Sequence, residues 1–164
     1  KPMYAQIADL VRRTRQHHAI EHATIHMLTR RNPQERFSGH SDPAGFTIYG
    51  AVEEADLRRA VGDALLRLQA GEHQLAIHPN CGTNLATSAL LVTLASLVAG
   101  SGRGSFLQRF SAVLLLVLPA LIVAKPLGYR LQQYTTLAEV GDRWVADIRP
   151  VHLGKVQVYR VLFD

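Results

Sequence analysis

The first thirty residues place apolar side chains at a helical spacing. Between residues 3 and 29 the apolar positions of such a helix are supplied by Ile7, Leu10, Val11, Ile20, Ile25, Met27 and Leu28. The pair Asn32-Pro33 follows and interrupts helical hydrogen bonding. The pattern therefore predicts a long N-terminal helix over residues 3–29.

The remaining polar segments predict a small module of mixed α and β structure. Residues 46–52 and 155–164 alternate apolar and polar side chains as strands do, and residues 73–79 are expected to form a third, short strand. Residues 53–71 and 135–148 are expected to be helical, and residues 37–45 are expected to form a loop. The fold class is α/β (α+β), with a βαβ half and an αβ half sharing one sheet.

Two apolar runs interrupt this module. Residues 83–102 contain no charged side chain, and residues 110–124 contain none either, with Pro119 as a kink in the second run. The first run is long enough to span the hydrocarbon of a bilayer, and a short Gly/Ser turn joins the two. We expect a transmembrane helical hairpin, and the alternative is a buried hairpin in a soluble protein.

These patterns divide the chain into three parts. Residues 1–82 hold the N-terminal helix and the βαβ half, residues 83–128 hold the hairpin, and residues 129–164 complete the same cytoplasmic module. The two helices of the hairpin pair either with each other within one chain or between the chains of a homo-oligomer. The lipid bilayer is the expected partner.

Charge supports this organisation. The chain has 18 Lys and Arg against 13 Asp and Glu, a formal net charge of +5, and all but Arg103 and Arg109 of the basic residues flank the apolar runs. Basic flanks predict that both termini face the cytoplasm of a multi-pass protein in the cell inner (plasma) membrane. They also account for the positive charge without a nucleic-acid partner. The single Cys81 excludes an internal disulfide.

The candidate chemistry lies on the first helix. His18, Glu21, His22 and His26 follow one helical stripe, and residues 18–22 have the pattern H-x-x-E-H. In inverted zincins such histidines bind zinc and the glutamate acts as general base. Imidazole also suits other divalent transition metals. The alternative is a set of solvated histidines on the polar face of the helix. His17 points away from the stripe and is expected on the surface.

A second group precedes the first apolar run. His78 and Cys81 are separated by two residues, and an imidazole and a thiolate are both good zinc ligands. A lone cysteine is more often a small buried apolar residue, so this pair is weak evidence by itself. His40 and Asp42 are further candidates, and turn formation is the alternative role for Asp42.

Three ordered motifs carry a family resemblance. They are HAIEHATIH at 18–26, HPNCGTN at 78–84 and LQQYTT at 131–136. In this order the chain resembles the YqhQ-like family of bacterial integral membrane proteins, as a short variant with one hairpin, over residues 15–145. The resemblance implies that His18, Glu21, His22, His26, His78 and Cys81 act as a unit.

Two functions follow from a metal at this place. The first is a membrane-associated zinc metallopeptidase or hydrolase at the cytoplasmic interface, in which His18, His22, and His78 or Cys81 hold zinc and Glu21 is the catalytic base. Its substrate would be a peptide or a membrane-protein segment. The second is a non-catalytic adaptor or sensor with a structural zinc site. A polar network that staples the first helix to the hairpin, without metal, is the third interpretation.

Overall fold

The computed structural model describes residues 2–153 and 156–164. They form two compact units, one made of Lys1–His78 with Thr135–Asp164 and the other of Pro79–Tyr134. The first unit contains helices and a sheet, and the second is a helical hairpin. The mixture of helices and strands expected from the sequence is therefore confirmed.

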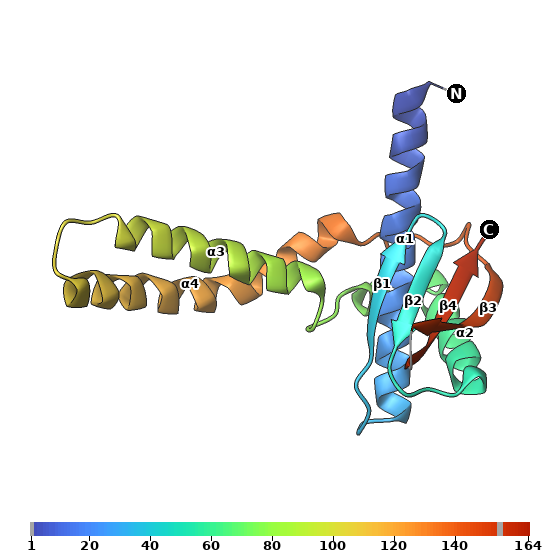
Figure 1. Cartoon of the computed structure of the whole chain (residues 1–164). Coiled ribbons are helices and arrows are strands. Elements are labelled where there is room, and N and C mark those ends of the chain that lie inside the picture. Colours follow the sequence, from blue (N-terminus) through green and yellow to red (C-terminus); the bar gives the residue numbers. More distant parts are fainter. Residues whose placement is uncertain (1, 154–155) are drawn as a thin grey trace. The chain divides into compact units, whose positions relative to one another are not determined.

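The sheet of the first unit has four antiparallel strands in the order β1-β2-β4-β3 (Figure 1). They are β1 (Ser38–Asp42), β2 (Gly45–Tyr49), β3 (Val145–Leu153) and β4 (Val156–Phe163). β2 and β4 confirm the two strands predicted from alternation. β1 and β2 form one hairpin, β3 and β4 form another, and the β2–β4 ladder joins them.

Two helices pack on this sheet, α1 (Met3–Arg31) and α2 (Glu54–Gln69) (Figure 1). The core lies between them and the strands because each element turns its apolar positions inward. It includes Ile20 and Leu28 of α1, Leu57 of α2, Phe46 of β2 and Val161 of β4, all completely buried. The N-terminal turns of α1 carry exposed side chains instead.

The βαβ arrangement expected from the sequence is wrong. Residues 73–79 contain the 3-10 helix η1 (His73–Ala76) in place of a strand, and its Leu75 and Ala76 are buried in the core. Residues 135–148 are not a helix either: a loop follows Thr135, and β3 begins at Val145. β3 lies at the edge of the sheet, which is where Pro150 is tolerated because it has no N–H to donate.

The loop expected over residues 37–45 is also wrong, since β1 occupies residues 38–42. The turn into β2 is set by Asp42, whose Oδ1 accepts hydrogen bonds from the backbone N–H groups of Ala44 and Gly45. Gly45 has a φ of 156°, and a side chain there would collide with the carbonyl oxygen of Val161. β1 lacks apolar alternation because it packs against a polar part of α1, described below.

The second unit consists of α3 (Gly82–Gly100) and α4 (Phe106–Thr135) (Figure 1). Both are long and apolar enough to cross a membrane, with mean hydropathies of 1.5 and 2.2, and few residues of either are buried. α3 and α4 approach closely at Gly128, where a Cβ would meet the Cα of Asn84 at 3.0 Å. Gln132 Nε2 also donates to Asn84 Oδ1 over 2.9 Å.

Candidate metal centre

The histidines of α1 lie in its buried half. From Gln16 to Leu28 the helix is enclosed by the sheet, by α2 and by η1, and only His18 and His26 in this stretch are half-buried. A buried imidazole requires partners for its nitrogens because an unpaired polar atom in the interior is costly. The partners of each ring therefore show what the ring can do.

His18 and His22 use the same nitrogen in the same way. Nδ1 of His18 lies 3.1 Å from the carbonyl oxygen of Thr135, and Nδ1 of His22 lies 2.7 Å from that of Ala76. A carbonyl only accepts, so Nδ1 carries the proton that is donated in both rings, and in the neutral form of each ring Nε2 carries the lone pair. The two ring centroids are 4.3 Å apart, and each ring has a nitrogen within 4.8 Å of the other's.

His78 lies beside this pair. Its ring centroid is 5.6 Å from that of His22 and 4.8 Å from that of His26, whose Nε2 contacts the carbonyl oxygen of Ile77 at 2.9 Å. Burial, and then the neighbouring rings of His26 and His22, lower the pKa of His78 to about 4. His78 is therefore neutral at physiological pH, which is the form that binds a metal. The structure thus brings His78 beside the histidines of α1, from which it is separated by more than fifty positions in the sequence.

Cys81 belongs to the other unit. It is the N-cap residue of α3, where its Sγ accepts a hydrogen bond from the backbone N–H of Thr83 at 3.4 Å. It follows His78 by three residues, and three residues of chain reach at most about 11 Å. Chain length alone keeps its thiol in the neighbourhood of His78.

Glu21 faces a different element from the histidine pair. Glu21 is 4% exposed, and its carboxylate accepts a hydrogen bond from Ser41 Oγ. It packs over Gly39 of β1 so closely that a Cβ there would lie 2.5 Å from Glu21 Cδ. Glycine at residue 39 makes room for the carboxylate, and serine at residue 41 binds it. Neither residue carried a sequence signal, because small polar residues are also typical of loops.

His17 is not on the surface, and that expectation is wrong. Its side chain is 1% exposed, Nδ1 lies 2.9 Å from the carbonyl oxygen of Asp42, and its ring stacks on Phe163 at 4.9 Å. Burial lowers its pKa below the ordinary value. His17 is a core residue because α1 is covered on this side by β1 and by the end of β4.

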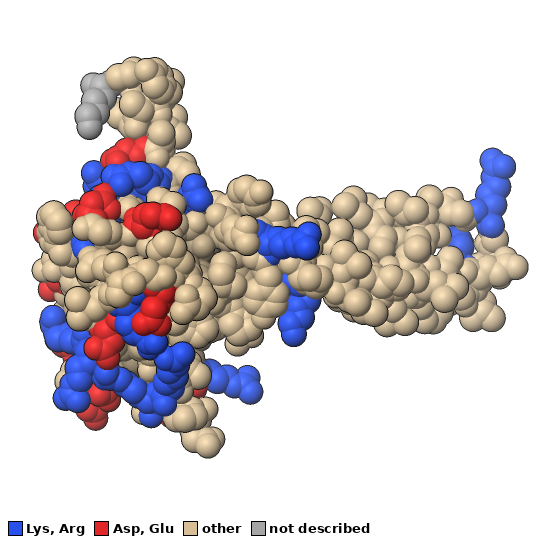
Figure 2. All heavy atoms as spheres, turned by 180° about the vertical axis from the view of Figure 1, so that it is seen from behind, with Lys and Arg blue, Asp and Glu red and all other residues tan. Residues whose placement is uncertain are grey.

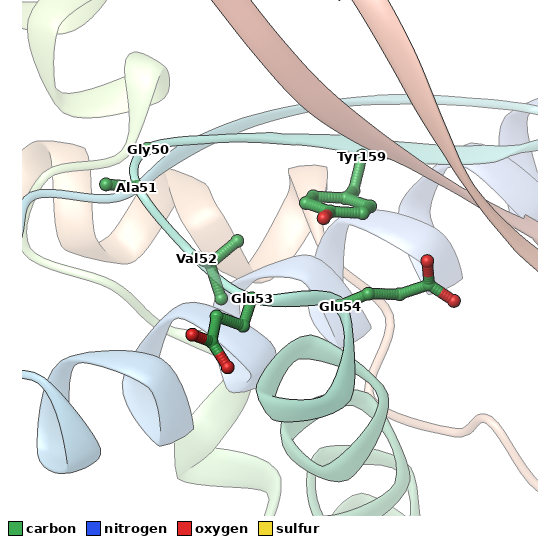
Figure 3. Close-up of a pocket in the computed structure, with 6 residues that line it drawn as sticks. All are labelled: Gly50, Ala51, Val52, Glu53, Glu54 and Tyr159. Atoms are coloured by element: carbon green, nitrogen blue, oxygen red, sulfur yellow. The ribbon is translucent and has the colours of Figure 1, made fainter.

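The two remaining candidates lie on β1. His40 is exposed, and Asp42 forms the turn into β2 while its Oδ1 also accepts a hydrogen bond from Arg160 at 2.6 Å. An open hollow lies elsewhere in the first unit, lined by residues 50–54 and the ring of Tyr159 (Figure 3). Its lining includes the carboxylates of Glu53 and Glu54 and none of the clustered histidines.

Comparisons with known proteins place these residues inside a shared domain. Residues 13–148 match the model of a family described as Domain of unknown function (DUF6391). An uncharacterised protein of Picosynechococcus sp. is 44% identical over 86 residues, which cover 47% of this chain and 42% of the relative. The chain thus spans less than half the length of that relative. No solved structure matches the chain.

Proposed function

We propose that this chain, which belongs to the DUF6391 family, is a membrane protein that binds one divalent transition metal ion, zinc, on the histidines of α1. His18 and His22 would bind through Nε2, and His78 would supply the third imidazole. Cys81 would supply a fourth bond as a thiolate. The observation that carries the proposal is the shared orientation of His18 and His22.

That orientation has a chemical meaning. Histidines that bind metals usually donate their other ring N–H to a carbonyl or carboxylate, which fixes the tautomer and directs the lone pair at the ion. The carbonyl groups of Thr135 and Ala76 receive these N–H groups here. Nitrogens bound to tetrahedral zinc are roughly 3.4 Å apart, since each Zn–N bond is about 2.1 Å. The nitrogens of His18 and His22, within 4.8 Å, need only a small ring movement.

The hairpin unit supports the membrane part of the proposal. On the face shown in Figure 2 its charged side chains lie at its two ends and leave an uncharged stretch between them. In the sequence this stretch of α4 runs from Arg109 to Lys125. The fifteen uncharged residues between these two rise about 22 Å, which spans most of a hydrocarbon core of about 30 Å. The proposed topology places both termini in the cytoplasm of the inner membrane.

A structural or sensory role fits the site better than hydrolysis. As a general base, Glu21 would have to accept a proton from water bound to the metal. The carboxylate is instead buried against β1 and bound to Ser41, where it holds α1 against the sheet. The metal would then supply cross-linking of α1 to the segment at His78. Peptide hydrolysis is the competing function, and the experiments below distinguish it from the structural role.

Metal content tests the proposal first. The full chain in detergent micelles is stripped with a chelator, given zinc and analysed for bound metal after gel filtration. We expect about one zinc per chain in the wild type, and loss of bound zinc in His22→Ala. His73→Ala is the matched control because this histidine is exposed on η1. Equal zinc in wild type and His22→Ala would exclude the ligand assignment.

Two further variants separate the competing roles. Cobalt replaces zinc as a spectroscopic probe, and the thiolate-to-cobalt charge-transfer band should disappear in Cys81→Ser if this thiol binds the ion. Glu21→Gln should retain zinc. If wild type cleaves a peptide library and Glu21→Gln with full zinc does not, the hydrolase function replaces the structural one.

A further inference from the structure

The partners of the clustered histidines share a position in the chain. His22 and His26 contact the carbonyl groups of Ala76 and Ile77, which lie three and two positions before the hairpin unit starts at Pro79. His18 contacts the carbonyl of Thr135, the first residue after that unit ends. Both points at which the chain leaves and re-enters the first unit are therefore held by imidazoles of one helix. We call residues 76–78 the first root and residues 135–139 the second root.

The second root is held further by the same part of α1. Arg15 donates to the carbonyl of Thr136 over 3.1 Å and accepts from the backbone N–H of Leu137 over 2.9 Å. Gln16 Nε2 donates to the carbonyl of Glu139 over 2.7 Å. Sequence separation between α1 and these residues is more than a hundred positions. The α1 segment from Arg15 to His26 is thus the element on which both roots converge.

We propose that the metal site is a clasp whose occupancy controls how firmly both roots of the hairpin are held. This rests on the proposed zinc site. Zinc on Nε2 of His18 and His22 keeps the proton on Nδ1 and stops the rings from rotating, so both Nδ1–H···O=C bonds are strengthened together. By linkage, a firmly held pair of roots raises the affinity for zinc by the same factor. The state of the metal is thereby communicated to the chain segments that enter the membrane.

Backbone hydrogen exchange tests this clasp directly. Two backbone amides report on the clasp, and neither belongs to a residue proposed to bind the metal. Ile77 N–H donates to the carbonyl of Gln74, and Leu137 N–H donates to the carbonyl of Arg15. Exchange is measured by mass spectrometry on the full chain in nanodiscs, metal-free, with one equivalent of zinc, and with magnesium as a control cation that prefers oxygen ligands. We expect zinc alone to slow exchange of both amides at least about 5-fold, the lower end of ordinary coupling, and to leave α2 unchanged.

A matched pair of variants isolates one root. His26→Ala removes the contact with Ile77 but no proposed ligand, so at saturating zinc it should still hold one ion per chain, with lower affinity, while it loses the protection at Ile77 and keeps that at Leu137. His73→Ala should behave as wild type at both. Stoichiometric zinc with unchanged exchange at Leu137 would overturn the clasp and leave the zinc site standing. Absence of bound zinc would overturn the proposed function and the clasp with it.

Discussion

One methyl group at Gly39 should disturb the first unit severely. In Gly39→Ala the new Cβ would lie 2.5 Å from Cδ and Oε1 of Glu21 and 2.7 Å from its Cγ, where ordinary contacts begin near 3.4 Å. Glu21 is 4% exposed and bound to Ser41, so its carboxylate must move and lose that bond. Overpacking costs about 1–3 kcal/mol and the lost hydrogen bond about 0.5–1.5 kcal/mol. We expect a loss of about 2–4 kcal/mol in the free energy of unfolding.

The same substitution elsewhere provides the control. Gly62 is in the interior of α2, and a Cβ there meets nothing within 4 Å. Because glycine is less favourable than alanine inside a helix, Gly62→Ala should stabilise the chain by about 0.5–1 kcal/mol. Urea unfolding in micelles is followed by the fluorescence of Trp144, the single tryptophan. A Gly39→Ala midpoint equal to that of the wild type would refute the proposed packing of Glu21 on β1.

Three other perturbations have defined outcomes. Burial and neighbouring imidazoles lower the pKa of His78 to about 4, so the unfolded chain takes up more protons than the folded one as the pH falls. The metal-free protein should therefore lose up to about 3 kcal/mol of its free energy of unfolding between pH 6.5 and pH 4. Urea midpoints measured with a chelator at several pH values check this, and a flat profile would contradict it. Asp142 accepts hydrogen bonds from two arginines and a glutamine, which hold its pKa far below the usual value, so Asp142→Asn should cost about 1–3 kcal/mol in urea unfolding. The control Asp63→Asn, which breaks a single exposed ion pair, should cost less than about 1 kcal/mol. Equal losses of unfolding free energy in the two variants would show that the hydrogen bonds of Asp142 add no more than an exposed ion pair does. Gln132→Leu removes the hydrogen bond to Asn84 and should lower the free energy of unfolding of the hairpin by about 0.5–2 kcal/mol. Thermal unfolding followed by circular dichroism measures this, and an unchanged transition would show that the bond does not stabilise the hairpin.

The sequence predicted the elements whose periodicity is set by one buried face. α2, β4 and the C-terminal half of α1 each turn apolar side chains toward one core at their own period, whereas Ile7, Leu10 and Val11 of α1 are exposed. Residues 83–124 are apolar enough to stand out by length alone. β1 could not be predicted this way. Its inward positions meet a carboxylate rather than a core, so Gly39 and Ser41 are the residues that fit. That requirement exists only once α1 and β1 are packed together.

The sequence predicted which residue types form the candidate site, but it did not predict which groups each imidazole contacts. Helical spacing alone brings His18 and His22 onto one stripe, but the position of His78 beside them depends on η1, which was predicted as a strand. Spacing also could not place His17, because the coverage of that side of α1 by Phe163 comes from the other end of the chain. The tautomers of the imidazoles follow from backbone carbonyl groups, which leave no signal in a sequence.

The β2–β4 ladder pairs Phe46 with Val161 and Ile48 with Tyr159, residues separated by more than a hundred positions. During synthesis, β2 leaves the ribosome long before its partner strand exists, and both apolar helices are made in the interval. The hydrogen-bonding edge that β2 turns toward β4 stays unpaired until α3, α4 and β3 have been synthesised. The sheet of the first unit therefore cannot be completed before both apolar helices have been synthesised, and a nascent polypeptide arrested after α4 would still expose the unpaired edge of β2.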